Sequence, residues 1–77
     1  MYYIYQKDKL IGSSNDIEYV VEFTKLMIDK AIDTERDASR KLKQLYEDKL
    51  VLNSPKVGIN QLQHILARLE YSLEVDI

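Results

Sequence analysis

The 77-residue sequence has no cysteine and no tryptophan, one proline, two glycines and one histidine. The absence of cysteine excludes disulfides, thiolate metal sites and a cysteine nucleophile, and it is compatible with a reducing compartment. The scarcity of proline and glycine, together with 45% hydrophobic residues, argues against disordered and fibrous classes. We therefore expect an ordinary helix-rich globular chain that folds without disulfides.

Long hydrophobic runs and an excess of one charge are also missing. The longest apolar run, Met1 to Tyr5, is far shorter than the roughly 20 residues that cross a bilayer, and no basic segment precedes it as in a secretory signal. With 11 Lys and Arg against 13 Asp and Glu, the net charge of -2 provides no overall basic field for nucleic acid or an anionic membrane. We expect a soluble, cytoplasmic protein without a membrane partner.

The length of the chain predicts a single small domain, residues 1–77. Such a domain buries only about 60% of the surface that its unfolded chain exposes. Association with a second copy or another protein would enlarge this thin core, and a homodimer is the simplest form of it.

The segment from Met1 to Gly12 predicts a β-hairpin, because aromatic and β-branched residues flank a polar turn at Lys7-Asp8-Lys9. Strand side chains alternate between two faces, so Tyr2 and Ile4 share one face. Tyr3 and Tyr5 share the other face with Lys7, and for this reason we favour burial of the first.

A helix is predicted from about Asp16. Residues 12–15 are interpreted as a turn, with Asn15 as the N-cap and Glu18 as its reciprocal partner. The apolar positions of this helix recur mainly at steps of three and four residues. They are Ile17, Val20, Val21, Leu26 or Met27, Ile28, Ala31 and Ile32.

Residues 16–51 form either two helices or one long bent helix. The stretch Thr34 to Asp37 contains no apolar anchor, and Thr34 followed by Asp37 is able to cap a second helix. After it, the apolar stripe resumes with Ala38, Leu42, Leu45, Tyr46 and Leu50. The alternative is a helix that runs unbroken to about Val51. We favour the break, because a helix of about 36 residues is rare in so small a domain.

Beyond residue 52, the only proline and the second glycine mark a loop, Asn53 to Gly58. Apolar residues from Ile59 to Leu69 then follow helical spacing, whereas Tyr71 to Ile77 alternates apolar and polar residues as in a half-buried strand. The predicted fold is α+β: an N-terminal hairpin, two to three helices, and a C-terminal strand that completes a small sheet.

No constellation predicts catalysis, and we expect no enzyme activity, metal or cofactor. His64 has no ligand or carboxylate at a suitable spacing, and no serine lies in a nucleophile-elbow context. The Ser13-Ser14-Asn15 stretch fits helix capping better than phosphate binding, because no glycine-rich loop or following lysine accompanies it. Asp29, Asp33 and Asp37 would share a face of a continuous helix, but nearby basic residues predict a solvated, charge-paired surface.

Arg36, Arg40 and Lys43 recur at steps of four and three with Lys41 beside them, so these four residues are the candidate nucleic-acid contacts. The segment Ala38 to Val51 resembles recognition helices of winged helix-turn-helix proteins. A second segment, Thr24 to Ile32, resembles the turn and second helix of a simple helix-turn-helix. These resemblances imply DNA reading by a helix in the major groove. They depart from the motif at Lys25 and Lys49, which occupy the turn positions that such motifs usually give to glycine.

Tyrosine is abundant, with six copies, three of them in the first five residues. Tyrosine supplies a large contact area at low entropic cost and is enriched at interfaces. Tyr3, Tyr5 and Tyr46 are the candidate protein-interface residues. We expect a non-enzymatic protein-binding module, such as an inhibitor or accessory regulator of a mobile element (a phage, for example) or a bacterium. A small helix-turn-helix-like transcriptional regulator is the alternative.

Overall fold

The computed structural model describes residues 1–35 and 40–76. It has an α+β fold with the N-terminal hairpin and the C-terminal strand that the sequence predicts, and the first two helices are separate. Residues 36–39 and 77, which include Arg36, Asp37 and Ile77 of the predictions above, lie outside the described residues. The elements are β1 (Tyr2–Gln6), β2 (Lys9–Ser14), α1 (Ile17–Thr34), α2 (Arg40–Leu52), α3 (Ile59–Arg68) and β3 (Ser72–Val75).

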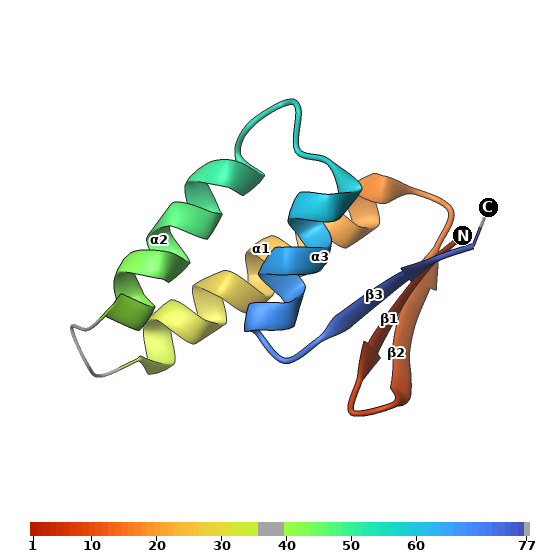
Figure 1. Cartoon of the computed structure of the whole chain (residues 1–77), viewed down its shortest axis with the longest axis horizontal. Helices are drawn as coiled ribbons and strands as arrows, with labels where there is room; N and C mark the ends of the chain where they lie inside the picture. The colour runs from red at the N-terminus through yellow and green to blue at the C-terminus, as the bar shows by residue number, and fades with distance from the viewer. Residues whose placement is uncertain (36–39, 77) are drawn as a thin grey trace.

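The three strands form an antiparallel sheet in the order β2-β1-β3, so the first strand lies between the two others (Figure 1). Lys7 and Asp8 form the two-residue hairpin turn with φ values of 49° and 66°. Positive φ at both central residues gives a turn whose twist matches that of the flanking strands. The turn therefore fixes the hairpin register without a glycine.

The second strand is longer than the sequence predicted. Residues 12–14, which belong to the turn expected over residues 12–15, instead pair with β1, where Ile4 is opposite Gly12. The register shifts next to this pair, because Tyr5 is opposite Leu10 and Ile11 is left as an extra residue in a β-bulge. Because the bulge interrupts the alternation of side chains, a search for apolar residues at every second position does not detect the full length of β2.

The N-cap of α1 lies one residue beyond the predicted one. Asp16, not Asn15, is the N-cap, and its Oδ1 accepts a hydrogen bond from the Glu18 amide at 3.0 Å. Ser14 Oγ in turn accepts from the Asp16 amide at 3.0 Å. Both Asn15 and Asp16 are good cap residues, and the extension of β2 through Ser14 decides between them.

The predicted break between the first two helices is present, although Thr34 does not cap the second. Thr34 is the last residue of α1, and its hydroxyl donates to the carbonyl of Lys30 at 3.1 Å. The C-cap that follows is Glu35, whose amide donates to the Ala31 carbonyl. A hydroxyl bonded within the last turn of α1 is not free to cap α2.

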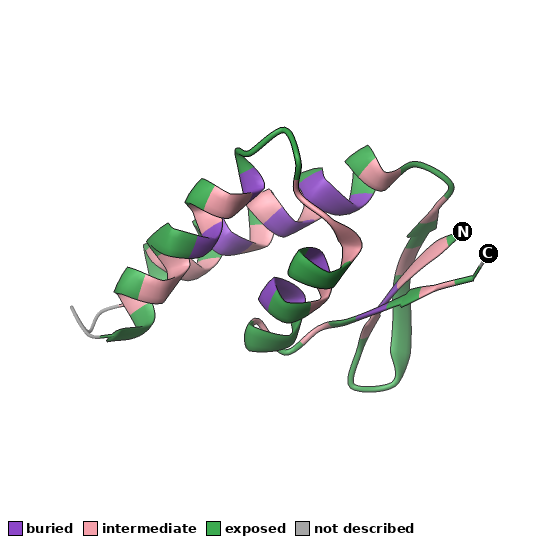
Figure 2. Ribbon diagram, turned by 45° about the horizontal axis from the view of Figure 1, so that its top comes forward, coloured by how far each residue is buried: buried purple, intermediate pink, exposed green. Residues whose placement is uncertain are grey.

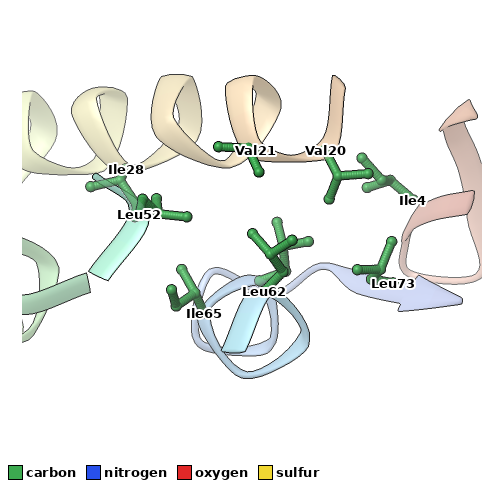
Figure 3. Packing of buried hydrophobic residues seen from close by; sticks show 9 residues of the cluster. Ile4, Val20, Val21, Ile28, Leu52, Leu62, Ile65 and Leu73 are labelled. Carbon is green, nitrogen blue, oxygen red and sulfur yellow. The ribbon is translucent and has the colours of Figure 1, made fainter. Parts of the chain in front are cut away.

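The hydrophobic core lies between one face of the sheet and the three helices (Figure 3). Ile4 is fully buried, which confirms that the face with Tyr2 and Ile4 turns inward. Figure 2 shows how burial on the helices is confined to the sides that face one another and the sheet. The buried apolar residues are Ile4, Val20, Val21, Ile28, Leu52, Leu62, Ile65, Leu66 and Leu73.

On α1, the structure selects Met27 rather than Leu26 for the inner side. Leu26 is 62% exposed, whereas the Met27 sulfur accepts a hydrogen bond from the Tyr71 hydroxyl at 3.3 Å. Thr24 is fully buried among the apolar residues because its hydroxyl donates to the Val20 carbonyl at 2.7 Å. A hydrophobic pattern alone does not identify such a position.

Candidate functional site

The face of the sheet that points away from the core has no described helix over it (Figure 1). Tyr3 and Tyr5 lie on this face, because they alternate with the inward Tyr2 and Ile4. Tyr3 is opposite Ser13 on β2 and opposite Glu74 on β3. Both tyrosines are half-buried by their neighbours in the sheet.

Two aliphatic side chains extend this surface, and sequence reasoning did not single them out. Leu10 is opposite Tyr5 and 49% exposed, and Ile11 is 41% exposed. Gly12 pairs with Ile4 and therefore lies on the inward face of the sheet. Because successive residues of a strand alternate between faces, the side chain of Ile11 projects outward, beside Leu10. The bulge thus adds two aliphatic residues to one face. We call Tyr3, Tyr5, Leu10 and Ile11 the open sheet face.

Acidic side chains border the open sheet face on the β3 side. Glu74 and Asp76 are both exposed. Asp76 pairs with Met1, since its amide donates to the Met1 carbonyl at 2.9 Å and the Met1 ammonium donates to the Asp76 carbonyl at 2.7 Å. The acidic border therefore continues past the end of β3, next to Met1.

Tyr46 lies far from the other two candidate interface tyrosines. It is 51% exposed on α2, at the opposite end of the molecule from the sheet (Figure 1). Leu50, one turn further along, is 72% exposed, and Lys43 precedes Tyr46 by three residues. Positions at steps of three and four share one side of a helix. One copy of the protein therefore cannot combine Tyr46 with Tyr3 and Tyr5 in one surface.

Of the candidate nucleic-acid contacts, Arg40, Lys41 and Lys43 are exposed on α2, while Arg36 lies outside the described residues. Arg40 and Lys43 share the side of α2 that carries Tyr46 and Leu50. We call Arg40, Lys43, Tyr46 and Leu50 the α2 outer stripe. Lys41 points elsewhere, because it lines a cleft between α1, α2 and the end of α3.

Most of the segment that resembles a recognition helix is helical, in α2, but neither resemblance has its turn in the described residues. Residues 24–32 lie inside the continuous helix α1, so they do not form a turn followed by a second helix. Lys49, at the turn position of the other resemblance, lies inside α2, which continues to Leu52.

The cleft that Lys41 lines has a volume of ≈ 550 Å³, and its polar groups mainly bind one another. The buried carboxylate of Asp48 accepts hydrogen bonds from Arg68 Nε at 3.1 Å and from Gln44 Nε2 at 3.0 Å. The bond to Asp48 raises the pKa of Arg68 above its usual value. Within residues 1–35 and 40–76, no buried side-chain nitrogen or oxygen lacks a partner. This network joins α2 to α3, and no pattern in the sequence predicted it.

The remaining polar candidates are also explained by local structure. Asp29 forms an ion pair with Lys49 at 2.9 Å, which joins α1 to α2, and the hydrogen bond to Asp29 raises the pKa of Lys49. His64 is exposed on α3. In the part of the chain that the structure describes, no three metal-ligating side chains converge. None of the helices described is long and apolar enough to cross a membrane.

No protein-family model, curated protein or solved structure matches this chain. Two surfaces of the molecule are therefore the candidates for function: the open sheet face and the α2 outer stripe.

Proposed function

We propose that this protein is a non-enzymatic protein-binding module and that the open sheet face is its interaction surface. The observation that carries the proposal is the grouping of Tyr3, Tyr5, Leu10 and Ile11 on a sheet face that no described helix covers. Aromatic and aliphatic side chains grouped on an exposed face are typical of interaction sites. The acidic border at Glu74 and Asp76 would favour a partner with basic residues beside its apolar contact.

The same surface would serve an inhibitor or accessory regulator, which acts by occupying a surface of its target. Such a role needs only a stable face on a small scaffold. The size of the chain suits an accessory protein of a mobile element, such as a phage, or of a bacterium. The proposed site of action is the cytoplasm.

Site-specific photocrosslinking tests the proposed surface. A photoreactive phenylalanine analogue at Tyr5 should yield a defined protein adduct in cells that express the protein, because the group lies within the contact. The same analogue at Glu22, an exposed position on α1, is the matched control and should yield none. Equal adducts from both positions, or none from Tyr5, would contradict the proposal.

A DNA-binding regulator is the second candidate, favoured by the exposure of Arg40 and Lys43 on one side of α2. Phosphate contacts release counterions, so binding through these residues would weaken steeply as salt increases. Fluorescence anisotropy with labelled duplex DNA at two salt concentrations measures this dependence. Binding that persists at physiological salt and disappears in the Arg40→Ala, Lys43→Ala double variant would favour this second function over the first.

A further inference from the structure

We propose that the α2 outer stripe of one copy docks on the open sheet face of a second copy, so that the protein associates head to tail. This inference depends on the proposed function, because it names the partner of the open sheet face. The two surfaces lie at opposite ends of a molecule that is 39 Å long (Figure 1). Within a single copy, the two surfaces therefore cannot contact each other and both stay exposed. The α2 outer stripe can contact an open sheet face only on a second copy.

Both surfaces expose large apolar side chains to solvent. Leu50 and Tyr46 project from α2 at 72% and 51% exposure, and Leu10 and Ile11 are exposed beside Tyr5 on the sheet. A helix laid on the free face of a sheet recreates the layered packing by which α+β domains bury a sheet. Docking would cover the side of the sheet that α1 and α3 leave open.

The charges of the two surfaces are complementary and occupy matching ends. On the sheet, Glu74 and Asp76 border the end nearest Met1, whereas Leu10 lies toward the hairpin turn. On α2, the basic residues Arg40 and Lys43 come first and Tyr46 and Leu50 follow, with the exposed Glu47 beside these two apolar residues. A helix aligned with the strands therefore places Arg40 and Lys43 against the two carboxylates. The positive end of the helix dipole would face the same carboxylates.

The spacings along the two surfaces also agree. From Arg40 to Leu50 the helix rises roughly 15 Å, at about 1.5 Å per residue. On the sheet, the Asp76–Met1 pair and the Leu10–Tyr5 pair are four β1 residues apart, or roughly 14 Å at about 3.4 Å per residue. Arg40 can thus contact Asp76 of the second copy while Leu50 contacts the Leu10–Tyr5 pair.

A contact between two different surfaces is heterologous, so the second copy still offers a free open sheet face or a free α2 outer stripe. Association should continue into a ring or an open chain rather than stop at a symmetric dimer. Sedimentation velocity on the purified protein, from micromolar to millimolar concentration, should show a mean mass that rises through and beyond the dimer.

A pair of complementing variants gives the decisive test. Tyr5→Lys blocks the open sheet face, and Leu50→Lys blocks the α2 outer stripe. Each variant alone should be monomeric, because every contact needs both surfaces. Mixed in equal amounts, they should form a dimer and nothing larger, since only one intact contact remains available. Leu26→Lys, at a residue that is 62% exposed on α1, is the control and should associate like the unmodified protein.

Charge reversal adds an independent measurement. Lys43→Glu and Glu74→Lys should each weaken association about tenfold or more, and their combination in one chain should recover most of it. Circular dichroism confirms that each variant is folded, which is expected because all of these side chains are exposed or half-buried.

Three results would overturn the head-to-tail contact. The first is a monomer at every concentration; in that case the Tyr5 photoadduct still tests the open sheet face with another partner. The second is a dimer that Tyr5→Lys dissociates and Leu50→Lys does not, which indicates a symmetric sheet-to-sheet contact. The third is a mixture of the two blocked variants that stays monomeric.

Discussion

Asp48 is 3% exposed in a chain whose other acidic residues lie mostly on the surface. Burial of a carboxylate is costly unless charge-assisted hydrogen bonds compensate for it, and here Arg68 and Gln44 supply them. Arg68 keeps much of its side chain in water, so it can rehydrate when its partner is lost. Asp48 is therefore the residue whose environment depends most on this network.

We expect Asp48→Ala to lower the free energy of unfolding by about 2 kcal/mol, because the bonds from Arg68 and Gln44 are lost. The free energy of unfolding of Asp48→Asn should lie between those of Asp48→Ala and the unmodified protein, since the amide keeps the shape of the side chain and one hydrogen-bond acceptor. Urea unfolding monitored by circular dichroism measures the difference. The control is Glu47→Ala at an exposed neighbour, which should change stability by less than about 0.5 kcal/mol. An Asp48→Ala variant as stable as this control would contradict the role of the network.

Gly12 is in close contact with an aromatic ring. A Cβ atom built at this position would overlap the Tyr19 hydroxyl oxygen and lie 3.3 Å from the adjacent ring carbon. Glycine thus allows the Tyr19 ring to lie across β2, and no positive φ is involved.

We expect Gly12→Ala to destabilise the protein by about 1 kcal/mol, because the ring has to move. In a Tyr19→Ala background the same substitution should instead stabilise the strand, since alanine loses less backbone entropy than glycine. Thermal unfolding of the unmodified protein, the two single variants and the double variant gives the sign of the stability change caused by Gly12→Ala in each background. The same sign in both backgrounds would show that the ring does not set the requirement for glycine.

At the scale of elements, β3 completes the sheet on the side of β1 opposite β2. Leu73 is 5% exposed and opposite the fully buried Ile4. The Gln63 side chain of α3 also donates to the Leu73 carbonyl at 3.1 Å. The strand thus links the sheet, the core and a helix.

Deletion of the chain from Ser72 onward should abolish cooperative unfolding, because a two-stranded hairpin is only marginally stable. The milder change Leu73→Ala should lower the free energy of unfolding by about 2–4 kcal/mol, as expected for a buried leucine. Ser72→Ala, at an exposed position of the same strand, serves as the control. Denaturant unfolding measures all three. A truncated protein that melts at the original temperature would show that β3 is dispensable.

Elements with a local sequence signal were predictable, and those that depend on distant partners were not. The alternation in residues 71–77 and the polar turn predicted at residues 7–9 are local signals, and they predicted β3 and the hairpin of β1 and β2. The bulge at Ile11 and the burial of Asp48 are not local: the bulge depends on the pairing with β1, and the bond to Arg68 spans 20 positions. Tyr3, Tyr5 and Tyr46 were predicted as interface residues on the sheet face or the second helix, and the fold places Tyr46 on a different surface from Tyr3 and Tyr5. The structure also exposes Tyr46 and Leu50, which the apolar spacing had assigned to the stripe of the second helix.

At the scale of the whole molecule, the chain brings residues from its two ends into adjacent strands. β1 pairs with β3 over four residue pairs, and Met1 and Asp76 exchange two hydrogen bonds beyond them. Pairing segments so distant in sequence requires closure of a long loop, which slows folding. By contrast, the loop between α2 and α3 is exposed at residues 53–56. The arrangement suits circular permutation, which succeeds at exposed loops when the ends lie close together.

We expect a circular permutant that begins at Lys56 and ends at Pro55, with a Gly/Ser linker of about four residues joining residues 77 and 1, to fold cooperatively. The new order makes β3, β1 and β2 consecutive, so all pairing in the sheet becomes local. Refolding measured by stopped-flow fluorescence of tyrosine should therefore be several-fold faster than in the original order, as lower contact order predicts. The interruption removes one exposed hydrogen bond, from the Lys56 amide to Ser54 Oγ, so its cost in stability should be small. A permutant that folds cooperatively but more slowly would show that closing the sheet does not limit the folding rate. Failure to fold would show that the connection between α2 and α3 is essential.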